Sequence, residues 1–291
     1  MDDPDLHLAD TVAAGAGLVD IEAARTLVGA GKSAVEWLIA QGTAFDTENG
    51  QIALGKEAAH SRSRVLHAGG DATGAEIERA LVERIAERHD MTIREHTALV
   101  DLRVVDGRCA GAELVSTTTG ARTTVASATT VLALGGAGQL WAVSSNPAGA
   151  TGDGIAIALR AGVTCADLEF TQFHPTVLDL PGEAPFLISE AVRGDGAVLR
   201  NDAGERFMVD IDPRAELAPR DVVARAIQAQ IASGSRVWLD LRHLDAAFVR
   251  QRFPTIARHL SAAGIDMATD RIPVAPAAHY FMGGIAAERA A

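Results

Sequence analysis

The chain has 291 residues, of which 48% are hydrophobic, and this is enough apolar material for one large domain or two smaller ones. Its formal net charge of −12 at pH 7 argues against binding to nucleic acid or to an anionic membrane, because a phosphate surface repels an acidic protein. A small anionic substrate would therefore need a local basic pocket.

The cysteines and the start of the sequence indicate a reducing compartment. Cys109 and Cys165 are the only cysteines, and their spacing is not that of a disulfide framework or a zinc site. The start, MDDPDLHLAD, is acidic where a signal peptide is basic, and glycines interrupt the most apolar run, residues 131–143. We predict a cytoplasmic protein with no metal centre and no membrane span.

Two helices are predicted in the first ninety residues. Residues 20–42 have helical periodicity, and Gly42 stands where a helix stops. Its apolar stripe, expected to be buried, consists of Ala34, Val35, Leu38 and Ile39. The next helix should begin at Thr73, with Thr73 and Glu76 forming a capping box.

From residue 91 to 134 the pattern changes to short β-rich runs separated by turns. The runs are MTIRE, TALVDLRVV, CAGAELVST, TTVASA and TTVLAL. A helix follows at TGDGIAIALRAG, with Gly162 at its end. This order predicts an α/β sheet that carries a β-meander.

After Glu169 the chain contains a further helix and a strand. The segment LAPRDVVARAIQAQIASG is predicted to be a helix with Pro219 in its first turn, and RVWLDL is predicted to be a strand. The sequence shows no internal repeat and no low-complexity segment.

Charged residues stand in an apolar, then glycine-rich stretch, FLISEAVRGDGAVLRNDAGERFM. Glu190 and Arg193 are three residues apart, so a helix would place them on one face, either as a solvated surface pair or as working groups. Arg220 lies in the first turn of a predicted helix, where the macrodipole disfavours a cation. Its partner is Asp221, a bound anion, or an acidic side chain from this stretch.

Glycines and polar residues follow the apolar run TTVLAL. Gly135 and Gly136 could let a ligand approach the backbone or could form a tight turn. The next loop could contact a polar cofactor or simply cap a helix, through Asn146, Thr151, Gly152 and Asp153. His174 and His279 each adjoin turn signals, and a satisfied structural histidine is the alternative to a working group at both positions.

Five segments in order carry a resemblance to a known family: HPT (174–176), ISEAVRGDGAVL (188–199), ERFM (205–208), APRDVVARAI (218–227) and PAAHY (276–280). Together they resemble the succinate dehydrogenase and fumarate reductase flavoprotein superfamily. Within it, HSRSRVLHAGGDATG (60–74), ELAPRDVVARAI and IPVAPAAHY are most similar to the L-aspartate oxidases.

The resemblance implies a fold in which part of a Rossmann-like FAD-binding domain, with the β-meander as an excursion, is joined to an α+β capping domain. The implied domains are residues 1–168 for the partial FAD-binding domain, 169–275 for the capping domain and 276–291 for the return. The superfamily's GxGxxG strand should precede Met1, and a further flavin-binding segment with a substrate arginine should follow Ala291. We therefore expect the chain to be a fragment.

The resemblance also implies roles for individual residues. Arg220 would be the acid or base that acts on the substrate, with Glu190 and Arg193 as its proton relay. The implied substrate-binding residues are His174, Ser189, His279 and Glu57. In place of KEAAHS the superfamily usually has a Gly-Gly pair, so the chain departs from it beside Glu57. The implied FAD contacts are Asp71, Ala72, Thr73, Gly135, Gly136, Asn146, Thr151, Gly152 and Asp153.

The implied activity is FAD-dependent oxidation of L-aspartate to iminoaspartate for NAD biosynthesis, with O2 or fumarate as acceptor and quinolinate synthase as a partner. The alternatives are a fumarate reductase or succinate dehydrogenase flavoprotein, a non-catalytic remnant, and a scaffold that binds a dicarboxylate without turnover.

Overall fold

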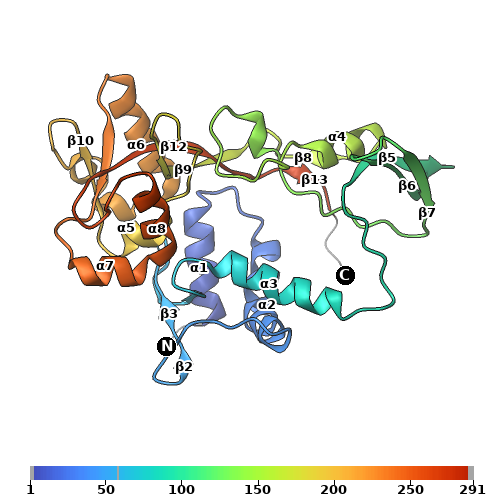
Figure 1. Ribbon diagram of the computed structural model, residues 1–291, viewed down its shortest axis with the longest axis horizontal. Helices are drawn as coiled ribbons and strands as arrows, with labels where there is room; N and C mark the ends of the chain where they lie inside the picture. Colours follow the sequence, from blue (N-terminus) through green and yellow to red (C-terminus); the bar gives the residue numbers. More distant parts are fainter. Residues whose placement is uncertain (1–2, 58, 288–291) are drawn as a thin grey trace. The chain divides into compact units, whose positions relative to one another are not determined.

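The computed structural model describes residues 3–57 and 59–287 (Figure 1). It divides the chain into two compact units: residues 1–89 with 175–276, and residues 90–174 with 277–291. These compact units do not test the predicted boundaries of the FAD-binding and capping domains, so those two domains stay a prediction. Over the described residues, no helix is both long enough and apolar enough to cross a membrane.

The first unit opens with two helices, α1 (Pro4–Ala14) and α2 (Ile21–Ala40). Asp20 caps α2 by accepting hydrogen bonds from the backbone N–H groups of Glu22 and Ala23, which confirms the predicted helix. The predicted burial of its stripe is wrong, because Ala24 is the only buried residue among those of α2. Within the described residues α2 packs mainly on α1, and Ile39 is 42% exposed.

Two small hairpins precede the third helix. They pair β1 (Thr47–Glu48) with β2 (Gln51–Ile52) and β3 (Leu54–Gly55) with β4 (Val65–Leu66). Helix α3 (Thr73–Ala86) begins at Thr73 as predicted, but the capping box is wrong. The Thr73 hydroxyl instead accepts from the backbone N–H of Ala68, and Glu76 accepts from that of Ala44, because both side chains hold the preceding loops.

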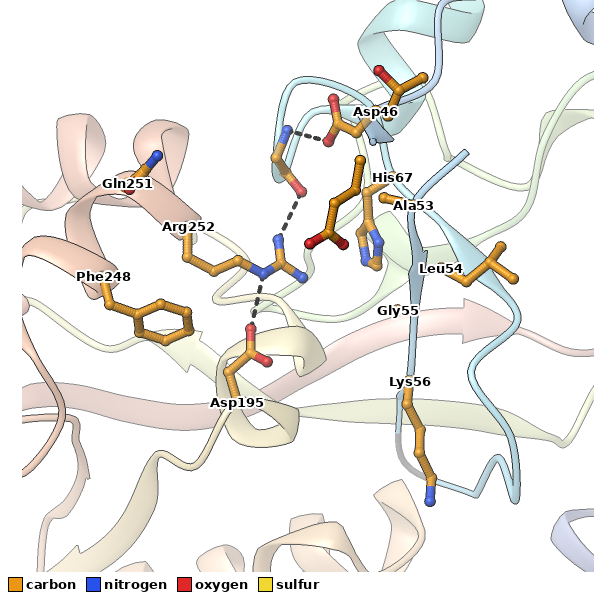
Figure 2. A pocket seen from close by; sticks show the side chains of 13 residues that line it. Asp46, Ala53, Leu54, Gly55, Lys56, His67, Asp195, Phe248, Gln251 and Arg252 are labelled. Atoms are coloured by element: carbon orange, nitrogen blue, oxygen red, sulfur yellow. Dashed lines mark hydrogen bonds and ion pairs between the residues drawn. The ribbon is translucent and has the colours of Figure 1, made fainter. Parts of the chain in front are cut away.

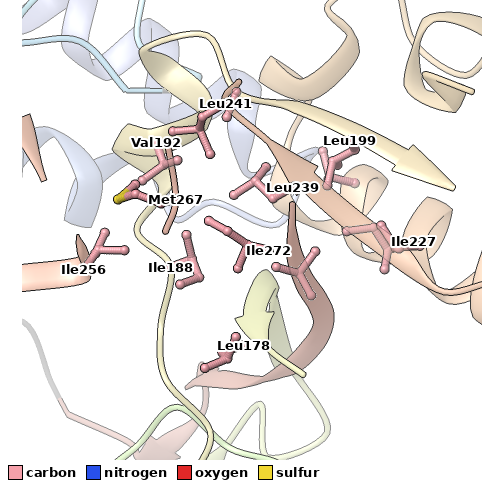
Figure 3. Packing of buried hydrophobic residues seen from close by; sticks show 14 of the residues in the cluster. Leu178, Ile188, Val192, Leu199, Ile227, Leu239, Leu241, Ile256, Met267 and Ile272 are labelled. Atoms are coloured by element: carbon pink, nitrogen blue, oxygen red, sulfur yellow. The ribbon is translucent and has the colours of Figure 1, made fainter. Parts of the chain in front are cut away.

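The rest of the first unit contains most of a four-stranded sheet, in the order β10 (Val198–Asn201), β11 (Val237–Asp240), β12 (Ile272–Phe281) and β9 (Thr171–Leu178). Strands β12 and β9 each include residues of the second unit as well. Antiparallel pairing sets Leu199 opposite Leu239 and Leu239 opposite Ile272. All three side chains are fully buried, and each contributes roughly 1.5–3 kcal/mol to folding. Figure 3 shows this core.

Helices and short turns surround this sheet core. The predicted helix after Pro219 is confirmed as α6 (Arg220–Ala232), with Val223 and Ile227 fully buried. The other elements are α5 (Glu190–Gly194), η2 (Phe207–Asp210), η3 (Ala215–Leu217), α7 (Ala246–Arg252) and α8 (Pro254–Ala262).

The second unit contains the predicted meander, β5 (Thr97–Val105), β6 (Arg108–Ser116) and β7 (Arg122–Ala126), in an antiparallel sheet. Its other elements are η1 (Gly138–Leu140), α4 (Asp153–Arg160), β8 (Cys165–Ala166) and β13 (Gly284–Ile285). The strands predicted at MTIRE and TTVLAL are wrong, because neither run is in a strand and Val131 is 83% exposed. No neighbouring strand among the described residues pairs with either run.

Asp10 on α1 anchors the loop between β3 and β4. Its Oδ2 accepts from the Ser61 backbone N–H and hydroxyl, each at 2.8 Å, and from Arg64 Nη1 at 2.5 Å. Burial alone would raise the pKa of Asp10, but these hydrogen bonds outweigh it and lower the pKa to about 2.

Acid should release this loop from Asp10. A carboxyl with a lowered pKa stabilises the fold above its unfolded pKa, so the contribution is complete at neutral pH and is lost as the pH falls from 3.8 toward 2. The Ser61 amide chemical shift, followed by NMR, should titrate with a midpoint near 2. The Asp10→Asn variant should lack this transition, and a midpoint at the ordinary value of 3.8 would contradict the assignment.

Candidate active site

The stretch around Glu190 forms a short buried helix. Ser189 caps α5 by accepting a hydrogen bond from the Ala191 backbone N–H at 3.3 Å. Ile188 and Val192 are fully buried in the core, so the same turn that carries the charged residues is fixed by apolar packing. The proposed contact of Ser189 with substrate stays a prediction.

Glu190 lies between two arginines. Its Oε2 accepts from Arg220 Nε at 2.5 Å, and its Oε1 lies 3.5 Å from Arg193 Nη2. Glu190 is 5% exposed and Arg193 is 1% exposed, so the alternative of a solvated surface pair is wrong. Burial at this level makes each charge depend on the others.

The cation at the start of α6 is compensated by Glu190 and not by its sequence neighbour. Asp221 pairs with Arg225 at 2.8 Å, one helical turn further along the same helix. Of the alternatives for Arg220, an acidic side chain from the stretch at 186–208 is the partner that the structure contains.

Arg193 is held deep in the first unit. Its Nη1 donates to the backbone carbonyl of Glu216 at 2.7 Å, while Nε and Nη2 have no hydrogen-bond partner among the described residues. Burial lowers the pKa of the Arg193 guanidinium, and the nearby charge of Glu190 opposes that change. Glu190 therefore stabilises the charged form of Arg193.

Glu57 belongs to the same electrostatic group. Its Oε1 lies 3.8 Å from His67 Nε2, which is too long for a hydrogen bond. Interaction with His67 lowers the pKa of Glu57 most, burial raises it, and the positive charge of Arg220 lowers it further. The structure thus brings Glu57 and Arg220 close enough for their charges to interact.

A pocket of about 770 Å³ opens beside the residues that precede Glu57 (Figure 2). Gly55, Lys56 and His67 line it on one side, and Asp195, Phe248 and Arg252 on the other. Arg252 Nε contacts Asp195 at 3.0 Å, and its Nη1 donates to the Gly70 carbonyl at 3.2 Å.

Asp71 has a structural role that the sequence did not predict. Its carboxylate accepts from the backbone N–H groups of Thr255 at 3.2 Å and Ile256 at 2.9 Å, at the start of α8. Thr73 is also engaged, with the Ala68 backbone. Contacts of Asp71, Ala72 and Thr73 with a cofactor stay predictions.

In the second unit, the two predicted histidines lie together. The rings of His174 and His279 are 5.0 Å apart at an interplanar angle of 66°, and His174 is 1% exposed. His279 Nδ1 lies 2.7 Å from the Ser145 hydroxyl, and Asn146 Nδ2 donates to the His279 carbonyl at 2.6 Å. The sequence singled out Asn146 and missed Ser145, although both stand in one polar run.

The glycine-rich loop of this unit keeps its backbone accessible. Gly135 and Gly152 have φ values of +71° and +80°, where a side chain is strained. Gly152 precedes α4, whose first turn has no side-chain cap, so the N–H groups there suit a polar or anionic ligand. A Cβ on Gly136 would lie 3.3 Å from Phe281 Cβ. The Thr151 hydroxyl donates to Asp153 Oδ2 at 2.9 Å.

Glu190→Gln should destabilise the first unit strongly. Removing the carboxylate of Glu190, which contacts both arginines, leaves buried Arg193 poorly compensated, at a cost of about 3 kcal/mol in unfolding free energy. Urea unfolding gives that value. The matched control is Asp221→Asn, which breaks an exposed pair and should cost under about 1 kcal/mol. Equal losses for the two variants would contradict the buried role of Glu190.

The family model for an FAD binding domain matches residues 1–291. The chain is 46% identical over 289 residues to the L-aspartate oxidase of Neisseria meningitidis serogroup B. The matched region covers 98% of this chain and 57% of that protein. It is 49% identical over 288 residues to the L-aspartate oxidase of Mesorhizobium japonicum, covering 99% and 56%.

Solved structures agree with this assignment. An E. coli quinol fumarate reductase FrdA variant matches with a TM-score of 0.91 and 30% identity, over 98% of this chain and 52% of that one. The chain spans a little over half the length of the two L-aspartate oxidases. The predicted resemblance and fold class are confirmed, and the chain belongs to the FAD binding domain family, within the succinate dehydrogenase and fumarate reductase flavoprotein superfamily.

Proposed function

We propose that the protein containing this chain oxidises L-aspartate to iminoaspartate with FAD, for NAD biosynthesis, using O2 or fumarate as acceptor. The observation that carries the proposal is the buried Glu190 that contacts both Arg193 and Arg220. Identities of 46% and 49% to proteins named L-aspartate oxidase support the choice of reaction.

The three side chains become more buried along the contacts from Arg220 through Glu190 to Arg193. The side chain of Arg220 is 23% exposed, that of Glu190 is 6% exposed and that of Arg193 is 0% exposed. An arginine in water rarely acts as a base, because its high pKa keeps nearly every side chain protonated at neutral pH. Through its hydrogen bond to the buried Glu190 carboxylate, Arg220 passes its own Nε proton to Glu190 as it takes a proton from the substrate.

The substrate is a dicarboxylate that also carries an amine. Within the first unit, we assign a carboxylate to Ser189 and the ammonium to Glu57, whose lowered pKa keeps it charged at neutral pH. Within the second unit, carboxylate binding is assigned to the neighbouring rings of His174 and His279. Loss of a hydride from Cα and of a proton from the amine converts aspartate to iminoaspartate, so both a hydride acceptor and a base are needed.

FAD, when bound, supplies the hydride acceptor. The glycine-rich loop of the second unit fits such a group, because the first turn of α4 has no side-chain cap and its backbone N–H groups suit a polar or anionic ligand. The residues of this loop that would hold FAD are Gly135, Gly136, Asn146, Thr151, Gly152 and Asp153.

Fumarate reduction is the second candidate, supported by the TM-score of 0.91 to a quinol fumarate reductase. Fumarate has no ammonium, so a carboxylate at Glu57 favours aspartate. A cytoplasmic location and quinolinate synthase as partner complete the proposal, and they rest on the composition and on the family resemblance.

Arg220→Met tests the proposed function. In the protein expressed from the complete reading frame that contains this chain, it should lower kcat for aspartate by on the order of a hundredfold, with FAD content kept. The control is Arg225→Met on the same helix, whose exposed side chain pairs with Asp221. Turnover and flavin absorbance are measured on both. A flavin-loaded Arg220→Met protein with near-normal kcat would remove Arg220 from the mechanism, and a wild-type protein without turnover would favour a remnant or scaffold.

Glu57→Gln should separate the two candidate substrates. The change removes a charge that only aspartate can pair with, so kcat/KM for aspartate should fall roughly tenfold while that for fumarate changes little. Glu48→Gln, on the wall of the neighbouring pocket, is the control. Equal losses with both substrates would show that Glu57 does not bind the amine.

A further inference from the structure

A second buried carboxylate, Glu216, stands behind the relay. It is 3% exposed, and its Oε2 accepts from Arg206 Nη2 at 2.6 Å. Oε1 accepts from Arg206 Nε at 3.0 Å and from the Leu199 backbone N–H at 3.0 Å. The side chain is thus fixed from two directions, by the segment of η2 and by strand β10.

The backbone of the same residue contacts the relay directly. The Glu216 carbonyl accepts from Arg193 Nη1 at 2.7 Å, and this is the hydrogen bond that fixes the buried guanidinium. A movement of the Glu216 backbone would therefore shift Arg193 relative to Glu190.

The turn that carries Glu216 needs support. It is the three-residue turn η3, and the residue before Glu216, Ala215, has φ of +48°. A left-handed conformation is unfavourable for an alanine, so the turn is not held by its own backbone preferences. Four residues after Glu216 the chain reaches Arg220, the first residue of α6. One turn therefore sets the position of both relay arginines.

The charge state of Glu216 agrees with this support. Burial raises its pKa, but the hydrogen bonds from Arg206 and from the Leu199 N–H outweigh burial and hold the pKa below its usual range. Glu216 is therefore a carboxylate at neutral pH, which gives charge-assisted hydrogen bonds to Arg206.

We propose that Glu216 and Arg206 are positioning residues. Their side-chain pair fixes the turn η3, and η3 holds Arg193 and Arg220 on either side of Glu190. The inference rests on the proposed function for its effect on catalysis, but the geometry of Arg193 can be measured without turnover. Neither residue contacts the substrate in this account.

The test uses Glu216→Gln in the protein from the complete reading frame, with Asp240→Asn as control. Asp240, at the end of β11, is also 3% exposed and also contacts arginines, but these are Arg200, Arg242 and Arg271. Both variants should lower the melting temperature. Only Glu216→Gln should lower kcat, by about tenfold, while KM stays within about twofold. Only Glu216→Gln should move the guanidinium NMR signal of Arg193, assigned through its loss in Arg193→Lys.

The outcomes separate the inference from the proposed function. An Arg193 signal that moves in a protein without turnover supports positioning and rejects the proposed function. An unmoved signal and unchanged kcat in a folded Glu216→Gln protein overturn the inference. Should that variant not fold, Arg206→Lys, which keeps the charge but loses the two-nitrogen contact, is measured instead. It should lower kcat by about threefold and shift the same signal, and no change in either would overturn the inference.

Discussion

The burial of the Arg193 guanidinium is the constraint on which the rest of the site depends. A fully buried cation is costly unless an anion and hydrogen-bond acceptors surround it. Glu190 supplies the anion at 3.5 Å and the Glu216 carbonyl supplies an acceptor at 2.7 Å. Glu190 also pairs with Arg220, the residue that we assign to substrate proton transfer. The carboxylate that compensates Arg193 therefore also fixes the position of Arg220.

The core of the first unit makes this arrangement rigid. Ile188 and Val192 flank Glu190 and are fully buried in the cluster that also contains Leu199 and Leu239 (Figure 3). The charged residues are thus carried by a turn that apolar packing has already fixed. Rearranging the relay would disturb that packing, so a preorganised site and a stable core have the same cause.

The sequence predicts local features of this site better than its long-range contacts. Spacing on one helix turn predicts the Glu190 and Arg193 pair, and the misplaced cation predicts that Arg220 needs a partner. Arg220 pairs with Glu190, thirty positions away, and not with the adjacent Asp221, and this depends on tertiary packing. The roles of Asp71 and Glu216 depend on tertiary packing as well. Predicted strands at MTIRE and TTVLAL failed because periodicity cannot show whether a pairing strand is present.

The central claim is that Glu190 and Arg220 act as one unit in proton transfer. A double-mutant cycle on kcat/KM for aspartate tests it most directly, with Glu190→Gln, Arg220→Met and the double variant, each corrected for bound FAD. The account predicts that the double variant is no more than about threefold worse than the poorer single variant. Losses that multiply across the two substitutions would show that the residues act independently and would contradict the account.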